Sequence, residues 1–536
     1  MNRARSLRSL LLGAAGLFLS LPVYADSLMP QLVEKNGRHA FMVDGAPFLL
    51  LAAQANNSSN YPAVLRDVWP ALEKLQANTL EIPVAWEQVE PVEGRFDFSY
   101  LDILLKEARA RNLRLVLLWF ATWKNNGPNY APAWVKLDNK RFPRVLKQDG
   151  TTLNSLSPHS RETLEADKKA FVALMSYLKK ADPGHTVLMV QLENEVGTYG
   201  SVRDFSAAAE QLFKAAVPET LLRSLRKQSG TWSAVFGADA DEFFYAWHIA
   251  AFCNEVAAAG RAVYPLTVNV NVALRDPFKP GKPGAYSSGG PTDNVIAVWK
   301  AAAPELAMIT PDIYMPQHDK VMRVLDYYSR PDNALFISEI GNAQTYARYF
   351  FAALGRGAVG FAPFGMDYTD YGNYPLGAKE VTDEVLEPFA ANYRLFRQLE
   401  RVWPRLGFEG RVWGVAEPDG GNHAQRLDLG DWDANVTYGR HQFWIDPPTG
   451  NTPPSGGIAI AELGPGEYLV TGYHARVEFA ASAELKGKNF LYERVEEGHF
   501  ENDRWVFERV WNGDQTDWGL NFTSRPHILK VKMGTY

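Results

Sequence analysis

Two glutamates, Glu195 and Glu339, each end a short apolar run and could act as a pair of catalytic carboxylates. Glu195 closes the segment TVLMVQLENE, and Glu339 lies in ALFISEI. Hydrolysis of a glycosidic bond needs one acid that protonates the leaving oxygen and a second carboxylate that attacks or stabilises the oxocarbenium ion. A single glutamate at such a position is solvated or salt-bridged about as often as it is catalytic. Two of them in corresponding places favour a catalytic pair, which requires neither a metal nor a cofactor, and we expect neither.

The elements that carry these glutamates alternate between short β-rich runs and amphipathic helical segments from about residue 38 to 400. Eight runs read as strands: 48–54, 79–86, 113–120, 186–195, 264–272, 308–314, 334–340 and 358–365. An open, doubly wound sheet would show the same alternation. The count of eight, and glutamates at the ends of the fourth and seventh runs, favour an α/β fold of the (β/α)8 TIM-barrel type, whose active site lies at the carboxyl ends of the strands.

The chain divides into three parts by composition and pattern. Residues 1–25 combine three arginines with an apolar stretch and Val23-Tyr24-Ala25, which is typical of a secretory signal peptide. The apolar stretch of about 12 residues is too short to span a bilayer. We expect a catalytic barrel over 26–402 and a β-sandwich-like domain over 403–536, where short alternating segments are separated by Gly, Pro, Asn and Asp. The protein is predicted to be exported, either periplasmic or secreted, and not bound to a membrane after cleavage.

Composition narrows the class of partner. The 536 residues are 46% hydrophobic and 22% charged, with a formal net charge of -6. No basic run interleaved with aromatic residues is present, so nucleic acid is a poor candidate partner and a carbohydrate fits better. Oligomerisation with a second copy is left open. The single cysteine, Cys253, cannot form an internal disulfide, and the glycine-rich stretch 355–360 precedes a strand, which is the reverse of the order in a phosphate-binding loop.

Further side chains near the expected strand ends could contact a sugar. Aromatic rings can stack on a pyranose, although large aromatics are mostly used for burial. The aromatic candidates are Trp86, Trp119, Trp123 and Phe364, and the polar ones are Gln54, Asn56, Glu87 and Asn271. Strand alternation gives Glu193 the same facing as Glu195. We expect Glu193 to be a buried group of the barrel interior, because the acid should lie at the strand end.

Several motifs resemble those of clan A glycoside hydrolases. Gln191-Leu192-Glu193-Asn194-Glu195 and Ile337-Ser338-Glu339 look like the two catalytic signatures of the clan, and residues 40–400 resemble the β-galactosidases of families 35 and 42. The segment 86–98 is similar to a motif of both families. LWFATWKNNG is closer to family 42, and QLENEVGTYG is closer to family 35. The balance favours a divergent bacterial branch of family 35 with a C-terminal β-domain.

The resemblance implies roles for individual residues. Glu195 would be the general acid/base and Glu339 the nucleophile, with Asn194 on the sugar 2-hydroxyl and Tyr314 donating to the nucleophile. The position of a galactose-binding glutamate in family 35 is occupied here by Thr122. If the carboxyls lie about 5 to 5.5 Å apart, the reaction retains anomeric configuration. The charge of Glu339 would raise the pKa of Glu195, which favours its acid form at the start of the reaction.

The expected activity is that of an exo-β-galactosidase that removes terminal β-galactose from oligosaccharides or plant polysaccharides, with galactosylated xyloglucan as a reasonable substrate. Two alternatives stay open at this point. One is another retaining clan A activity, namely a β-glucosidase, β-mannosidase or endo-glycanase. The other is a non-catalytic carbohydrate-binding protein on the same fold, although such a protein would be expected to have lost one of the two glutamates.

Overall fold

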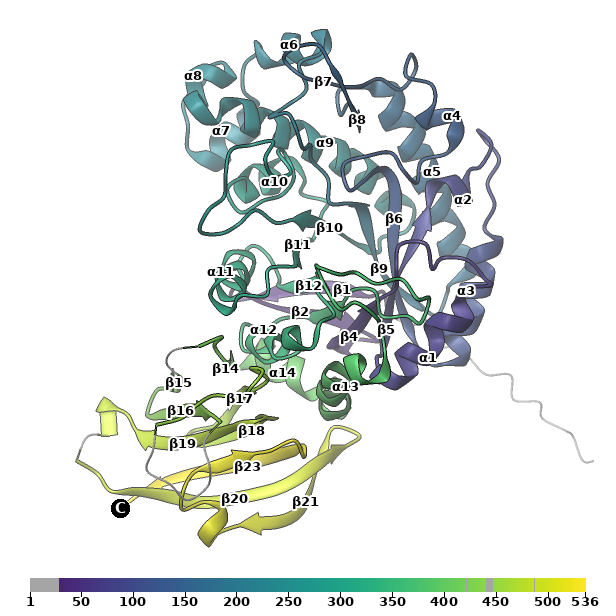
Figure 1. Ribbon diagram of the computed structural model, residues 1–536. Helices are drawn as coiled ribbons and strands as arrows, with labels where there is room; N and C mark the ends of the chain where they lie inside the picture. Colours follow the sequence, from purple (N-terminus) through teal and green to yellow (C-terminus); the bar gives the residue numbers. More distant parts are fainter. Residues whose placement is uncertain (1–27, 421–422, 440–446, 486) are drawn as a thin grey trace, which may run out of the picture.

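The computed structural model describes residues 28–420, 423–439, 447–485 and 487–536, so the expected signal peptide lies outside the described residues. Eight parallel strands close into a barrel in the order β4-β5-β6-β9-β10-β11-β12-β13 (Figure 1). They are β4 Leu50–Gln54, β5 Thr79–Ala85, β6 Arg114–Lys124, β9 Val187–Asn194, β10 Thr267–Ala273, β11 Met308–Ile313, β12 Phe336–Ile340 and β13 Gly360–Pro363. The prediction of a (β/α)8 barrel is confirmed, and each of the eight expected strands is present.

Alternation along the strands builds two apolar layers. In β6, Val116, Leu118 and Phe120 belong to one apolar cluster, whereas Leu117 and Trp119, on the other face of the strand, belong to a second cluster shared with the helices. Strands that are buried on both faces read as nearly continuous apolar runs. This is the pattern from which the strands were predicted.

The helices surround the barrel. They are α1 Leu65–Leu75, α2 Trp86–Val89, α3 Ser99–Ala110, α4 Ala133–Lys136, α5 Arg161–Ala181, α6 Ala207–Phe213, α7 Glu219–Leu225, α8 Trp232–Phe236, α9 Ala240–Val263, α10 Ile296–Ala302, α11 His318–Tyr328, α12 Tyr349–Leu354, α13 Asp383–Arg397 and α14 Val402–Glu409. Each of α1, α3 and α5 buries an apolar face, which includes Leu72, Leu104 and Leu174 in turn. In α5 the Ser160 hydroxyl caps the first turn by accepting from the Thr163 N–H at 3.2 Å. Within the described ranges, no helix has the length and apolar character needed to cross a membrane.

The C-terminal part is a sandwich of two antiparallel sheets, ordered β14-β17-β18-β23-β20-β21 and β15-β16-β19-β22. Its strands are β14 Val412–Ala416, β15 Ala424–Asp428, β16 Trp432–Tyr438, β17 Gly457–Gly464, β18 Glu467–Tyr473, β19 Ala475–Ala481, β20 Phe490–Glu501, β21 Arg504–Trp511, β22 Leu520–Phe522 and β23 His527–Thr535. One apolar cluster contains Ile460 and Val470 from the first sheet and Val436 and Val477 from the second. The β-sandwich-like domain is therefore confirmed.

Two small sheets complete the fold. Before the barrel, β1 Gln31–Lys35, β2 Arg38–Val43 and β3 Ala46–Pro47 form an antiparallel sheet, and β7 Arg144–Leu146 pairs with β8 Thr152–Leu156. Figure 1 shows the sandwich beside α12, α13 and α14, on the side of the barrel that carries β11 and β12. The sandwich therefore lies next to the units that bear Tyr314 and Glu339.

Candidate active site

Glu339 lies in β12, and its carboxylate is held by two donors, one at the end of β4 and one directly after β11. Gln54 Nε2 donates to Oε2 at 3.1 Å, and the Tyr314 hydroxyl donates to Oε1. The side chain is 6% exposed. These two hydrogen bonds fix the orientation of the carboxylate, as attack by a nucleophile requires.

The backbone at Glu195 is strained and is held by side chains from other strands. Glu193 and Glu195 have φ values of 60° and 48°, in the left-handed region that non-glycine residues rarely adopt. The Glu195 N–H donates to Asn271 Oδ1 at 2.8 Å, and its carbonyl accepts from Asn126 Nδ2 at 2.8 Å. Such strain persists only where the surroundings impose it, and it is concentrated at functional sites.

The environment of Glu195 favours its acid form near neutral pH. Burial, and then the negative charge of Glu339, raise the pKa of Glu195 to about 7, against the opposing effects of Lys124 and of a hydrogen bond from Asp312. Lys124 is 5% exposed, and its ammonium lies 2.7 Å from Asn125 Oδ1 and 5.0 Å from the centre of the Phe120 ring. A carboxylic acid with such a pKa can donate its proton to a leaving group and later accept one from water.

A third carboxyl group, Asp312, belongs to the site and was missed by the sequence reasoning. It lies near the end of β11, where Oδ2 accepts from Asn271 Nδ2 at 2.7 Å. Burial and the charges of Glu339 and Glu195 raise the pKa of Asp312 well above its usual range. The raised pKa favours the protonated form of Asp312, in which it can donate to Glu195. Its position two residues before Tyr314 was the available signal, because alternate residues of a strand share a face.

A fourth acid, Glu81 of β5, lies deeper in the barrel. Burial, and then the charge of Glu339, raise its pKa well above the usual range. Among the described residues neither of its carboxyl oxygens has a hydrogen-bond partner. The cost of an uncompensated buried charge keeps this group neutral, so Glu339 keeps its place as the nucleophile candidate.

Five of the predicted binding residues meet at the two glutamates: Gln54, Asn194, Asn271, Tyr314 and Phe364. The Phe364 ring stands edge-on to Tyr314, with ring centres 6.4 Å apart. The Asn194 oxygen accepts from Asn271 Nδ2 at 3.1 Å, and its amide donates to Asn125 at 3.1 Å. A contact of these residues with a sugar stays a prediction.

The structure corrects the expectation for Trp86 and Trp119. Both are fully buried in the layer between the strands and the helices. The Trp86 indole donates to Glu90 at 3.0 Å, and that of Trp119 donates to Asp167 of α5 at 2.9 Å. Neither ring can stack on a sugar in the barrel mouth. Trp119 lies on the outer face of β6, and proximity to a strand end does not say which face a side chain occupies. Trp86 is the first residue of α2, after the end of β5.

The side chains of Trp123 and Glu87 have partners other than Glu195 and Glu339. The Trp123 indole donates to the Leu156 carbonyl at 3.0 Å within the same buried layer. Glu87 lies on the outer rim, where it forms an ion pair with Lys136 at 2.8 Å. A contact of Glu87 with a sugar stays a prediction.

Glu193 is buried as expected, but its carboxylate does not point into the barrel interior. Its Oε2 accepts from the Trp123 N–H at 2.7 Å. Burial and then Asp167 of α5 raise its pKa well above the usual range, and its charge is also felt by Cys253 of α9. The left-handed φ of Glu193 breaks the alternation from which the inward facing was inferred. Glu193 thus has no access to the site of Glu195.

The arrangement suits acid–base and nucleophilic chemistry on a neutral ligand. The pKa of Glu195 is raised to about 7, which suits an acid/base group, and Glu339 accepts hydrogen bonds from two donors, which suits a positioned nucleophile; a retaining glycosidase requires these two roles. Over the part of the chain that the structure describes, no group of three or more His, Cys, Asp or Glu side chains is arranged to hold a metal ion.

Sequence comparison identifies two regions. Residues 63–243 match the family described as Beta-galactosidase, glycoside hydrolase family 42, and residues 389–523 match a Domain of unknown function (DUF5597). The resemblance to clan A β-galactosidases is thereby confirmed. The matching family is family 42, whereas the motifs alone favoured family 35.

The relatives share only part of their length with this chain. A β-galactosidase of Xanthomonas manihotis is 30% identical over 190 residues, which are 34% of this chain and 29% of that protein. A β-1,2-glucosyltransferase of Ignavibacterium album is 23% identical over 223 residues, which are 38% of this chain and 30% of that protein. The chain thus spans less than a third of the length of these relatives.

Solved structures of glycosidases are also similar. The β-galactosidase from Bacillus circulans sp. alkalophilus has 13% identity and a TM-score of 0.47, over 68% of this chain and 61% of that one. The exo-β-1,4-mannosidase Op5Man5 from Opitutaceae bacterium strain TAV5 has 16% identity and a TM-score of 0.42, over 69% and 63% of the two chains.

Proposed function

We propose that this chain, whose residues 63–243 form a domain of the β-galactosidase family, is a retaining exo-β-galactosidase. The observation that carries the proposal is that two carboxyls at the carboxyl ends of β9 and β12 have different environments. Glu195 has its pKa raised to about 7, and Glu339 accepts hydrogen bonds from Gln54 and Tyr314. These are the states in which a general acid and a nucleophile enter the reaction.

The mechanism follows from these states. Glu339 attacks the anomeric carbon while Glu195 gives its proton to the departing glycosidic oxygen, so a covalent glycosyl-enzyme forms. The ester has no charge, so the repulsion that raised the pKa of Glu195 falls. Glu195 then accepts a proton from water, which attacks the same carbon and releases the sugar with its configuration retained.

Galactose is the proposed sugar because the matching family is described as Beta-galactosidase and a β-galactosidase is among the relatives. A panel of aryl β-galactoside, β-glucoside and β-mannoside tests it. We expect the galactoside to have the highest kcat/KM. A higher value for another glycoside would replace galactose as the sugar while leaving the carboxylate pair in place.

Catalysis and stereochemistry are tested separately from the sugar. Glu339→Ala should abolish turnover and leave sugar binding measurable by calorimetry. The first product released from an aryl β-galactoside, followed by NMR, should be the β-anomer. An α-anomer would show inversion and would overturn the double displacement, and full activity of Glu339→Ala would remove Glu339 from its role.

The natural substrate and the cellular site complete the proposal. We propose export to the periplasm or beyond, supported by the signal-like pattern of residues 1–25. There the enzyme would remove terminal galactose from oligosaccharides or plant polysaccharide side chains such as those of xyloglucan. Release of free galactose without shortening of the backbone is expected from galactosylated xyloglucan, whereas backbone fragments would show endo action.

A further inference from the structure

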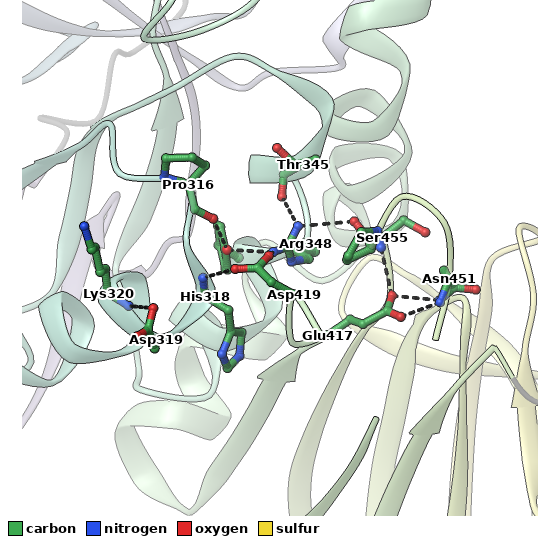
Figure 2. Close-up of polar contacts among 12 residues, drawn as sticks. Pro316, His318, Asp319, Lys320, Thr345, Arg348, Glu417, Asp419, Asn451 and Ser455 are labelled. Carbon is green, nitrogen blue, oxygen red and sulfur yellow. Dashed lines mark hydrogen bonds and ion pairs between the residues drawn. The ribbon is translucent and has the colours of Figure 1, made fainter. Parts of the chain in front are cut away.

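We propose that the C-terminal sandwich helps to position the nucleophile Glu339 and its hydrogen-bond donor Tyr314. Asp419 is the positioning residue of the sandwich. The inference rests on the proposed function. Asp419 follows β14 and contacts the two barrel connections that come after β11 and β12 (Figure 2). Tyr314 directly follows β11, and Glu339 lies in β12. One side chain of the sandwich therefore contacts the segment that follows each of these two strands.

The first contact is at the start of α11. The His318 N–H donates to Asp419 Oδ2 at 2.6 Å, and no side chain of α11's own N-cap residue, Gln317, makes this bond. The first N–H groups of a helix lack partners within the helix, and a carboxylate there also interacts favourably with the helix dipole. The β11–α11 connection begins at Tyr314, so Asp419 fixes the far end of the segment that starts with the donor to Glu339.

The barrel holds the middle of the same connection. The Tyr349 hydroxyl of α12 donates to the Pro316 carbonyl at 2.6 Å. Tyr349 in turn accepts a hydrogen bond from Arg348 Nη2 at 2.7 Å. The segment from Tyr314 to His318 is thus tied to α12 at one point and to the sandwich at the other.

The second contact of Asp419 is an ion pair with Arg348. Arg348 is 2% exposed, and its Nη1 donates to the Thr345 carbonyl at 2.9 Å and to the Pro454 carbonyl at 3.2 Å. Among the described residues, Asp419 is the carboxylate that pairs with this guanidinium. The Asp419 side chain is 48% exposed, whereas the guanidinium is buried, so loss of Asp419 would leave a buried cation without its carboxylate. Asp419 therefore joins the connections after β11 and β12 into one unit.

The sandwich keeps Asp419 in place through Glu417. This carboxylate is fully buried and accepts from the Ser455 N–H at 2.8 Å, the Gly456 N–H at 2.9 Å and Asn451 Nδ2 at 2.8 Å. It thereby fixes the loop whose Pro454 carbonyl accepts from Arg348 (Figure 2). The Arg348 site is thus built jointly by barrel and sandwich.

Backbone packing prevents the sandwich from sliding along α12. A Cβ atom added to Gly355, at the end of α12, would lie 1.9 Å from the Gly414 nitrogen of β14. A Cβ added to Gly414 would lie 2.0 Å from the Phe351 carbonyl oxygen. The two backbones are in direct contact, so the position of Asp419 relative to α12 is set by the fold.

The test is a double-mutant cycle between Asp419 and Tyr314 in the full-length chain. The measured rate is covalent inactivation by a 2-deoxy-2-fluoro-β-galactoside with an activated leaving group, because this step needs the nucleophile and no acid. Displacement of catalytic groups by a fraction of an ångström is costly, and we expect Asp419→Ala to slow inactivation about tenfold. Asp419→Asn keeps an acceptor for the His318 N–H, so it should slow inactivation less than Asp419→Ala does.

The cycle separates positioning from general stability. In the Tyr314→Phe background, Asp419→Ala should change the rate less than about twofold, since coupled residues are not additive. Glu462→Gln removes a pair with Arg411 in the same sandwich, at 2.8 Å, and should leave the rate unchanged. Equal losses in both backgrounds, or equal losses for Glu462→Gln, would overturn the proposal. Should Asp419→Ala fail to fold, the same cycle with Asp419→Asn decides.

A second readout does not depend on the proposed function. Amide hydrogen exchange should be faster between residues 314 and 320 in Asp419→Ala than in the wild type, and unchanged there in Glu462→Gln. If the wild type acts on no glycoside, the proposed function fails. The exchange measurement still tests whether Asp419 holds the segment from Tyr314 to Lys320. Unchanged exchange in Asp419→Ala would refute the positioning role of Asp419, whatever the activity.

Discussion

The Asn271 side chain accepts a hydrogen bond from the Glu195 backbone N–H at 2.8 Å. Its Nδ2 group also donates to Asp312 Oδ2 at 2.7 Å. One amide of β10 therefore holds both the acid candidate, in its strained left-handed conformation, and the carboxyl that donates to it. Asn271 acts on catalysis through the position of Glu195.

Asn271→Ala should weaken acid catalysis more than nucleophilic attack. Without the amide oxygen, the strained backbone at Glu195 loses one of the two side-chain contacts that hold it, and the Glu195 carboxyl moves away from the glycosidic oxygen. General acid catalysis contributes about 10²- to 10⁴-fold, so we expect kcat/KM for a phenyl galactoside to fall at least tenfold. A dinitrophenyl galactoside, whose leaving group needs no proton, should lose much less. Equal losses for the two substrates would contradict this role.

Asp312→Ala should move the basic limb of the kcat/KM profile to higher pH. Asp312 donates a hydrogen bond that lowers the pKa of Glu195, which stands at about 7 with that bond present. Its removal raises the pKa, so Glu195 keeps its proton to a higher pH. The basic limb of the free enzyme reports this group.

Asp312→Asn is the matched control, because its amide can still donate. Its basic limb should stay close to that of the wild type. A shift of the Asp312→Ala limb to lower pH would show that Asp312 is charged in the free enzyme, and would reverse its assignment as a donor.

The sequence predicted the barrel and its two carboxylates for a physical reason. Strands buried on both faces leave long apolar runs, and Glu195 and Glu339 stand out because each interrupts such a run at its end. Side-chain facing was harder. The left-handed backbone at Glu193 turns its carboxyl toward α5, and no pattern of residue types encodes that φ value.

Contacts between distant segments also could not be predicted from the sequence pattern. Asp312 becomes conspicuous only when Asn271 and Glu195 are placed beside it. The pairing of Asp419 with Arg348 depends on how the sandwich packs on α12, which the periodicity of either segment does not contain. Aromatic residues near strand ends gave the least reliable signal, as Trp119 illustrates.

Trp119→Phe should lower stability without changing substrate binding. The indole is buried and donates to Asp167 at 2.9 Å, so the change leaves a gap and an unpaired acceptor. Together these effects should cost about 1–3 kcal/mol of the free energy of unfolding, with KM unchanged.

Tyr199→Ala is the contrasting variant, because Tyr199 is 48% exposed and the charge of Glu195 acts on its hydroxyl. It should change KM and leave stability unaltered, and a raised KM in Trp119→Phe would return Trp119 to the cleft.

Two adjoining histidines should make the protein sensitive to acid. His159 and His248 have ring centres 4.7 Å apart beside Phe244, and neither His159 nitrogen has a hydrogen-bond partner among the described residues. Burial lowers the pKa of each to about 3, with smaller contributions from Arg203 to His159 and from His159 to His248. Both rings are therefore neutral in the folded protein at pH values where they are charged in the unfolded chain.

The sign follows from proton binding. Between the unfolded value of about 6.5 and the folded value, the unfolded chain binds more protons, so stability falls as the pH falls through this window. Each histidine should contribute a slope of about 1.4 kcal/mol per pH unit there. The double variant His159→Phe/His248→Leu removes both groups, and its Tm should fall less than that of the wild type between pH 6.5 and 4. His499→Gln, at an exposed histidine whose pKa is raised by Glu501 and Glu508, should not flatten the curve. Parallel Tm curves for the wild type and the double variant would show that the buried pair is not the acid-sensitive element.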